Sequence, residues 1–163
     1  MAERLVAADA SPLIGLASAG AFGLLRKLFP KVTVTAAVCD EVAAGGDLPG
    51  ARELEAAIRD GWIVVVPNPD DEEHVDLGAG ESSTLTLARN HPGACLVLMD
   101  DPLGRSHARA HGLAVTGVAG VLLAARRAGL ASSIRPLFER LGRIDFRLSG
   151  EIVRTVLEQA GEL

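Results

Sequence analysis

Five acidic residues stand where strands of an expected sheet end or where the following helices begin: Asp9, Glu41, Glu81, Asp100 and Asp101. In a parallel sheet the carboxyl ends of the strands meet at one edge, and ligands bind in the crevice outside that edge. Carboxylates gathered there repel one another, and a hard divalent cation such as Mg²⁺ or Mn²⁺ relieves the repulsion. Because such a cation activates water and neutralises charge on a phosphoryl group, the pattern favours metal-dependent phosphodiester hydrolysis.

Three of these acids also have simple structural explanations. Asp9 follows a short apolar run and stands just before Pro12, where an Asp commonly caps a helix. Glu41 lies less than two turns into an expected helix and could simply face solvent. Glu81 stands in the first turn of another helix, and the helix dipole alone favours a carboxylate there. The support for a site comes from their common location at one edge of the sheet.

The doublet after the fourth expected strand has two candidate roles. Asp101 precedes Pro102, which suits the first turn of a helix, so Asp101 has a structural task as its cap. Asp100 is then freer to bind a cation, although the sequence leaves open which member of the doublet does so. Gly104 weakens the helix that follows.

The elements that must position these acids alternate along the chain. Short apolar or β-branched runs predict strands at 4–8, 31–35, 62–66, 94–99 and 113–116. Helical spacing and caps predict helices between the strands, and two closing helices at 134–141 and 149–160. This alternation predicts a single three-layer α/β/α domain over 1–163, with a mainly parallel central sheet of about five strands and closing helices at about 133–161.

Composition limits the alternatives. The 163 residues suffice for one well-buried domain, and 48% hydrophobic with only 3% aromatic residues indicates an aliphatic core suited to parallel strands. No apolar run is long enough to span a membrane and the N-terminus lacks a signal pattern, so we expect a cytoplasmic location. Cys39 and Cys95 lack the spacing of a disulfide framework or zinc site, so we expect reduced thiols.

Charge is distributed unevenly around a net value of −5. Residues 1–100 carry a net charge of −8, whereas residues 101–163 carry +3 and all of their cations are arginines. Guanidinium groups match phosphate well, so Arg105 and Arg109 are candidates for contacts with RNA phosphates. Most of the other arginines are explained equally well as solvated helix faces.

Three further patterns are assigned no chemistry. The glycines of Leu77–Ser83 imitate a dinucleotide loop, but no strand directly precedes them and a serine replaces the third glycine. His107 and His111 are one helical turn apart, but Ala108 stands where the zinc-protease motif needs Glu, so we interpret them as surface or packing histidines. The acidic segment 70–76 is interpreted as a solvated loop.

The motifs together resemble the PIN-domain nucleases, in particular a prokaryotic branch of small toxin-like proteins. They cover nearly the whole chain, and in order they are Asp9–Ile14, Val38–Glu41, Leu77–Glu81, Leu98–Asp101 with Arg105, and Gly112–Gly117. The resemblance implies a metal-dependent ribonuclease that hydrolyses RNA with Mg²⁺ or Mn²⁺ and leaves 5′-phosphate products. It also implies the toxin role of a toxin–antitoxin pair, with an antitoxin-like protein partner, and a homodimer.

The resemblance assigns roles residue by residue. The expected catalytic residues are Asp9, Glu41, Glu81 and Asp100, the expected metal ligands are these four with Asp101, and the expected polar neighbours are Ser11 and Thr116.

Two other interpretations use the same alternation of strands and helices. A phosphoryl-accepting receiver domain would need a lysine after the fifth strand, but the only lysines are Lys27 and Lys31. The alternative that stays open is a non-catalytic PIN-like module that binds nucleic acid or a protein partner through its arginines.

Overall fold

The computed structural model describes residues 3–70 and 74–163. Its described strands form one sheet in the order β3-β2-β1-β4-β5, and every neighbouring pair is parallel. The strands are β1 (Leu5–Ala8), β2 (Val32–Thr35), β3 (Ile63–Val66), β4 (Cys95–Leu98) and β5 (Ala114–Thr116). Each lies within its predicted range, and β1 is at the centre of the sheet.

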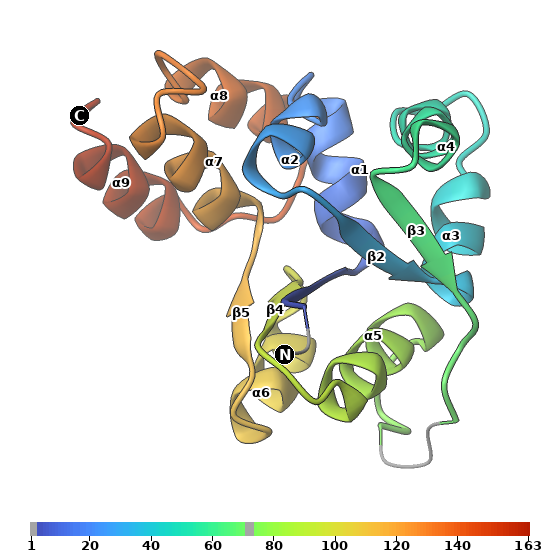
Figure 1. The fold of residues 1–163 in the computed structure, drawn as a ribbon. Helices are drawn as coiled ribbons and strands as arrows, with labels where there is room; N and C mark the ends of the chain where they lie inside the picture. The colour runs from blue at the N-terminus through green and yellow to red at the C-terminus, as the bar shows by residue number, and fades with distance from the viewer. Residues whose placement is uncertain (1–2, 71–73) are drawn as a thin grey trace.

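Helices cover both faces of the sheet. Figure 1 shows α1, α2 and α7 on one side of the strands and α5 and α6 on the other, which confirms the three-layer α/β/α fold. The described helices are α1 (Ala10–Ser18), α2 (Gly23–Leu28), α3 (Ala36–Ala43), α4 (Ala51–Asp60), α5 (Ala79–Asn90), α6 (Pro102–Ala110), α7 (Val118–Arg127), α8 (Arg135–Arg143) and α9 (Gly150–Gln159). None of them is long and apolar enough to cross a membrane.

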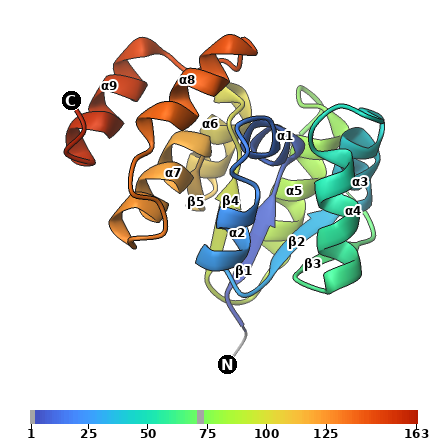
Figure 2. The same ribbon diagram turned by 90° about the horizontal axis from the view of Figure 1, so that it is seen from above.

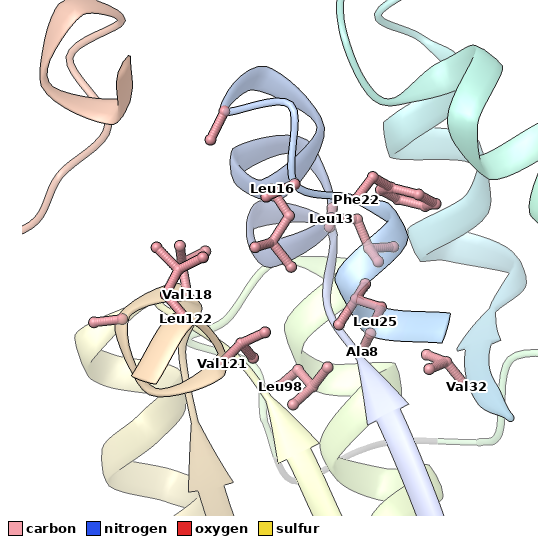
Figure 3. Packing of buried hydrophobic residues seen from close by; sticks show 14 of the residues in the cluster. Ala8, Leu13, Leu16, Phe22, Leu25, Val32, Leu98, Val118, Val121 and Leu122 are labelled. Carbon is pink, nitrogen blue, oxygen red and sulfur yellow. The ribbon is translucent and has the colours of Figure 1, made fainter. Parts of the chain in front are cut away.

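The larger apolar core lies between the sheet and the layer of α1, α2 and α7. Ala8 of β1 and Leu98 of β4 are register partners, and both side chains enter this core. Figure 3 shows Leu13 and Leu16 of α1 converging on them from above. Residues of α8 and α9 also join the cluster, and Figure 2 shows these two helices beside α7 at one end of the molecule.

A smaller core lies on the opposite face, under α5 and α6. Val97 and Met99 point there because side chains alternate across a strand, and they meet Leu85 of α5 and Ala108 of α6. A Cβ on Gly104 would lie 2.3 Å from the Met99 sulfur. The glycine that weakens α6 on sequence grounds therefore lets this helix pack closely against the end of β4.

Candidate active site

Asp9 lies at the carboxyl end of the central strand with its side chain almost completely enclosed. It occupies the N-cap position of α1, but its side chain makes no capping hydrogen bond, so the capping explanation fails. Only 1% of the residue is exposed, and within the described structure neither carboxylate oxygen accepts a hydrogen bond. A buried carboxylate in this state costs free energy unless the group is protonated or a cation compensates it.

The surroundings of Asp9 disfavour its negative charge. Burial is the largest cause that raises its pKa, from 3.8 to about 7, and the charge of Glu81 is the second. Glu41 and Asp101 raise the pKa further, while the neighbouring backbone amide of Ala10 partly offsets them. Three of the other predicted acids therefore lie near enough to act on Asp9 electrostatically.

A short chain of hydroxyl groups holds the starts of α3 and α5 together. The Thr35 side chain caps α3 by accepting a hydrogen bond from the Val38 amide, and its hydroxyl lies 2.8 Å from that of Ser83 on α5. Ser83 in turn donates to the carbonyl of Gly80 at 3.1 Å. This chain fixes the helix that carries Glu41 against the helix that carries Glu81.

Gly80 allows two of the carboxylates to approach the same point. A Cβ at this position would lie 2.8 Å from Oε2 of Glu41 and 3.1 Å from Oδ1 of Asp9. Burial raises the pKa of Glu41, and the charge of Glu81 adds to that effect. The space beside Gly80 is therefore lined by carboxylate oxygens of Asp9, at the end of β1, and of Glu41 on α3.

The two members of the aspartate doublet face different partners. Asp101 caps α6, as predicted, by accepting a 2.8 Å hydrogen bond from the Gly104 amide, and its charge also acts on Asp9. Asp100 accepts hydrogen bonds from the Val118 amide at 3.1 and 3.3 Å.

Asp100 also carries a perturbed pKa. Burial raises it from 3.8 to about 6, while the Val118 amide and the charge of Arg105 act in the opposite direction. Arg105 itself donates a 3.0 Å hydrogen bond to the Met99 carbonyl, which holds its guanidinium beside the doublet. Of the five acids, Asp100 is thus the one on which the charge of Arg105 acts.

Two hollows meet at this doublet. The acidic hollow has a volume of about 450 Å³, and Ser11, Glu81 and Asp101 are among the residues that line it. The arginine hollow has a volume of about 500 Å³, and Arg105, Arg109 and Thr116 are among its lining residues. The residues common to both hollows are Asp100, Pro102 and Arg147.

The connection between α8 and α9 forms a wall of both hollows. Residues 144–147 line the acidic hollow, and residues 147–149 line the arginine hollow. Sequence reasoning placed Arg147 in the basic part of the chain without relating it to the acids. No local motif marks it, because its position depends on how α8 and α9 fold back over the edge of the sheet.

His107 and His111, interpreted from the sequence as surface or packing histidines, lie beside a third histidine, His74. His74, His107 and His111 each offer one ring nitrogen, and these atoms lie within 4.8 Å of one another. His74 is only 3% exposed, so the prediction of a solvated loop over 70–76 was wrong for this residue. Asp70, Val75 and Asp76 are exposed, as predicted, and residues 71–73 lie outside the described residues. The pair spaced one turn apart on α6 was a visible signal, but its third member is distant in sequence.

The residues around Asp9 fit a divalent cation. A bound cation would compensate the enclosed carboxylate of Asp9 in its charged form, and the adjoining groups are oxygen donors of the kind that Mg²⁺ and Mn²⁺ prefer. No lysine or arginine is among the charges that act on Asp9, and Arg105 is turned toward Asp100 and the Met99 carbonyl.

Comparison with known proteins agrees with this arrangement. No curated protein sequence matches the chain. A family model described as a PIN domain matches residues 5–162, which include every strand and helix described above. PIN domains are generally nucleases, and those nucleases typically use divalent metal ions. The chain belongs to the PIN-domain family.

Proposed function

We propose that the protein is a metal-dependent endoribonuclease that hydrolyses RNA phosphodiester bonds at the edge of the sheet. The observation that carries this proposal is the enclosed, unpartnered carboxylate of Asp9 among other acids, next to hollows that open toward arginines. A cation in the acidic part would offset the repulsion between the carboxylates, and the basic part would bind the phosphates of the substrate.

The carboxylates that act on Asp9 are the first candidates to hold the ion. Asp9, Glu41 and Glu81 offer oxygens from three different elements, and Asp101 adds a fourth negative charge. We assign Asp100 to the same site, at the point where the two hollows meet. When bound, Mg²⁺ or Mn²⁺ would lower the pKa of water and neutralise developing charge on the phosphoryl oxygens.

The other residues of the hollows would position the RNA. Arg105 and Arg109 line the arginine hollow, where their guanidinium groups match phosphate geometry. Arg147 borders both hollows and can contact the phosphate next to the scissile bond. Ser11 and Thr116 add hydroxyl groups that can donate hydrogen bonds to phosphate or ribose oxygens. Water attack on phosphorus with departure of the 3′ oxygen would leave the 5′-phosphate product.

Three further proposals concern the domain organisation, the biological role and the oligomeric state of the protein. We propose that the chain folds as one domain, which is supported by the apolar cluster that runs from β1 to α9. A toxin role with an antitoxin-like partner is compatible with exposed arginines of residues 101–163, such as Arg109 and Arg127, and the homodimer follows the family resemblance. These assignments depend on the nuclease activity and are tested after it.

The direct experiment is cleavage of an end-labelled single-stranded RNA by the purified protein, in Mn²⁺ and in EDTA. We expect cleavage only in Mn²⁺, with products that carry a 5′-phosphate. RNA binding is measured in parallel by retention of the same RNA in Mn²⁺ and in EDTA.

The alternative of a non-catalytic module gives a different result. RNA that is bound equally well in Mn²⁺ and EDTA but stays intact in both would overturn the proposed activity. A melting temperature that Mn²⁺ does not raise would, in addition, contradict the metal site, since a ligand that binds only the native state stabilises it.

A further inference from the structure

We propose that His74, His107 and His111 form a second metal site, specific for a transition-metal ion such as Zn²⁺ and separate from the acidic residues at the edge of the sheet. Those acidic residues form the carboxylate cluster: Asp9, Glu41, Glu81, Asp100 and Asp101. The three histidines are called the histidine cluster below. The proposal does not depend on the nuclease activity, because it rests on residues that the carboxylate site does not use.

The geometry of the histidine cluster suits a small ion. Nε2 of His74 and Nε2 of His111 are 2.9 Å apart, and the His74 ring lies edge-on to both other rings at centroid distances of 5.3 and 5.2 Å. Zinc–nitrogen bonds of about 2.0–2.1 Å place tetrahedral ligands roughly 3.3 Å apart. All three ring nitrogens lie within 4.8 Å of one another, so ring rotations that shift nitrogens by about 1–2 Å bring them to bonding distance of one ion.

Asp76 supplies the partner that such histidines usually have. Nε2 of His107 lies 3.0 Å from Oδ2 of Asp76. Metal-binding histidines commonly donate their second ring N–H to a carboxylate, which fixes the ring orientation and makes the other nitrogen a better ligand. With Nε2–H donated to Asp76, the Nδ1 atom of His107 is available to the ion. Asp76 is thus a positioning residue of this cluster.

The chemistry of the donors separates the two sites. Imidazole nitrogens suit Zn²⁺, Cu²⁺ and Ni²⁺, whereas carboxylate oxygens suit Mg²⁺ and Mn²⁺. The sites are also apart in space. Asp101 caps the start of α6 and His111 caps its end, which is about 15 Å along the helix at 1.5 Å per residue.

The site would join two parts of the chain. His74 lies in the segment that leads into α5, while the other two ligands belong to α6 and its C-terminal cap. A bound ion would pin this segment to α6, a few residues before the helix turn that carries Glu81. The role we infer is structural, because it links the segment before α5 to the helix that Asp101 caps.

The test measures Zn²⁺ affinity of the full chain by competition with a chromophoric chelator, in excess Mg²⁺ so that the carboxylates are occupied. The variants are His107→Gln and His111→Gln, and the matched control is His91→Gln. His91 is the remaining histidine of the chain, and its ring bonds to the Glu3 carbonyl away from the histidine cluster. His107 has 26% of its side chain exposed, so His107→Gln should fold normally, which the melting temperature of the metal-free protein checks.

We expect the wild type and His91→Gln to bind one equivalent of Zn²⁺ at least about 10-fold more tightly than either cluster variant. Co²⁺ in place of Zn²⁺ should give the intense visible absorption of a tetrahedral nitrogen-rich site, and this absorption should be lost in His107→Gln. Asp9→Asn should retain full Zn²⁺ affinity. Equal affinities for the wild type and both cluster variants would overturn the proposal, as would loss of the tight site in Asp9→Asn.

Discussion

The carboxylate cluster and the histidine cluster lie at opposite ends of α6 and are built in different ways. The carboxylates stand at strand ends or in early helix turns, so the parallel sheet itself brings them to one edge. The histidines come from the segment before α5, from the C-terminal half of α6 and from the C-cap of that helix. Residues at the carboxyl ends of parallel strands meet at one edge in any sheet of this kind. A cluster between a loop and a helix forms only if that particular loop follows the right path.

The clusters also differ in how well they tolerate the absence of an ion. The oxygens of Asp9 accept no described hydrogen bond, and the neighbouring acids add repulsion. In the histidine cluster, His74 and His111 lie within hydrogen-bond distance of each other, and His107 contacts Asp76. We therefore expect the carboxylate cluster to destabilise the metal-free protein and the histidine cluster not to do so.

The largest expected effect is on the pH dependence of stability. In EDTA, folded Asp9 titrates at about 7 and unfolded Asp at 3.8, so the folded state retains a proton that the unfolded state loses between these values. The free energy of unfolding should therefore fall as the pH rises from 4 to 7, by up to about 4 kcal/mol from this group at 1.36 kcal/mol per pKa unit. Asp9→Asn should lack this contribution.

Urea unfolding of the wild type and Asp9→Asn in EDTA, from pH 4 to pH 8, measures this contribution as the difference between the two proteins. Mn²⁺ at pH 8 should reverse the difference by stabilising only the wild type. If the free energy of unfolding depended on pH in the same way in the two proteins, Asp9 would not be the group whose burial destabilises the metal-free protein.

The Zn²⁺ affinity of the histidine cluster should depend on Asp76, the carboxylate that contacts His107. Asp76→Asn removes the charge that holds the His107 ring, so we expect Zn²⁺ affinity to fall by about 10- to 100-fold while Mn²⁺-dependent cleavage is unchanged. The exposed neighbour Asp70 gives the matched control, since Asp70→Asn should alter neither property. A parallel loss of cleavage in Asp76→Asn would mean that the two sites are coupled.

Gly80 tests the carboxylate cluster without removing any charge. In Gly80→Ala the added methyl group would lie 2.8 Å from a Glu41 oxygen and 3.1 Å from an Asp9 oxygen, which forces the carboxylates apart. We expect at least about a 10-fold loss of Mn²⁺-dependent cleavage and a smaller Mn²⁺-induced rise in melting temperature.

Gly142 of α8 provides the comparison for that variant, because a Cβ there meets nothing within 4 Å. Gly142→Ala should preserve cleavage and stabilise the helix by about 0.5–1 kcal/mol. Similar activity in the two variants would show that the close approach at Gly80 has no role in metal binding.

The smallest expected effect separates the members of the doublet. Asp101→Asn keeps a good helix cap but removes a charge that acts on Asp9, so the pKa of Asp9 should fall, by less than in Glu81→Gln. Asp100→Asn should leave the pKa of Asp9 where it is, because Asp100 acts mainly with Val118 and Arg105. Carboxyl NMR titration of the three variants in EDTA gives these values, and an inverted order would reassign the doublet.

Much of the fold could be predicted because its signals are local. Short apolar or β-branched runs predicted each strand of the described structure, and the capping role of Asp101 was predicted correctly. The location of Asp9, Glu41 and Glu81 at one edge of the sheet also followed, since parallel strands end at the same edge. Their close approach depends in addition on the contact between Thr35 and Ser83 and on Gly80. The weakness attributed to Gly104 missed its packing against Met99, which depends on contact between distant segments.

The histidine cluster and the wall formed by Arg147 could not be predicted for the same reason. The i, i+4 spacing of His107 and His111 was visible, but whether a third ligand reaches them depends on the tertiary path of the segment before α5. Arg147 reaches the acids only because the connection between α8 and α9 crosses the edge of the sheet.

The most direct test of the account is the rate of RNA cleavage by Asp9→Asn at saturating Mn²⁺, with Asp40→Asn as the control. Asp40 neighbours Glu41 on α3 but is exposed and is not among the charges that act on Asp9. We expect Asp9→Asn to lose at least about 100-fold in cleavage rate while staying folded, and Asp40→Asn to cleave as the wild type does. Cleavage by a folded Asp9→Asn at the wild-type rate would contradict the assignment of the carboxylate cluster as the active site.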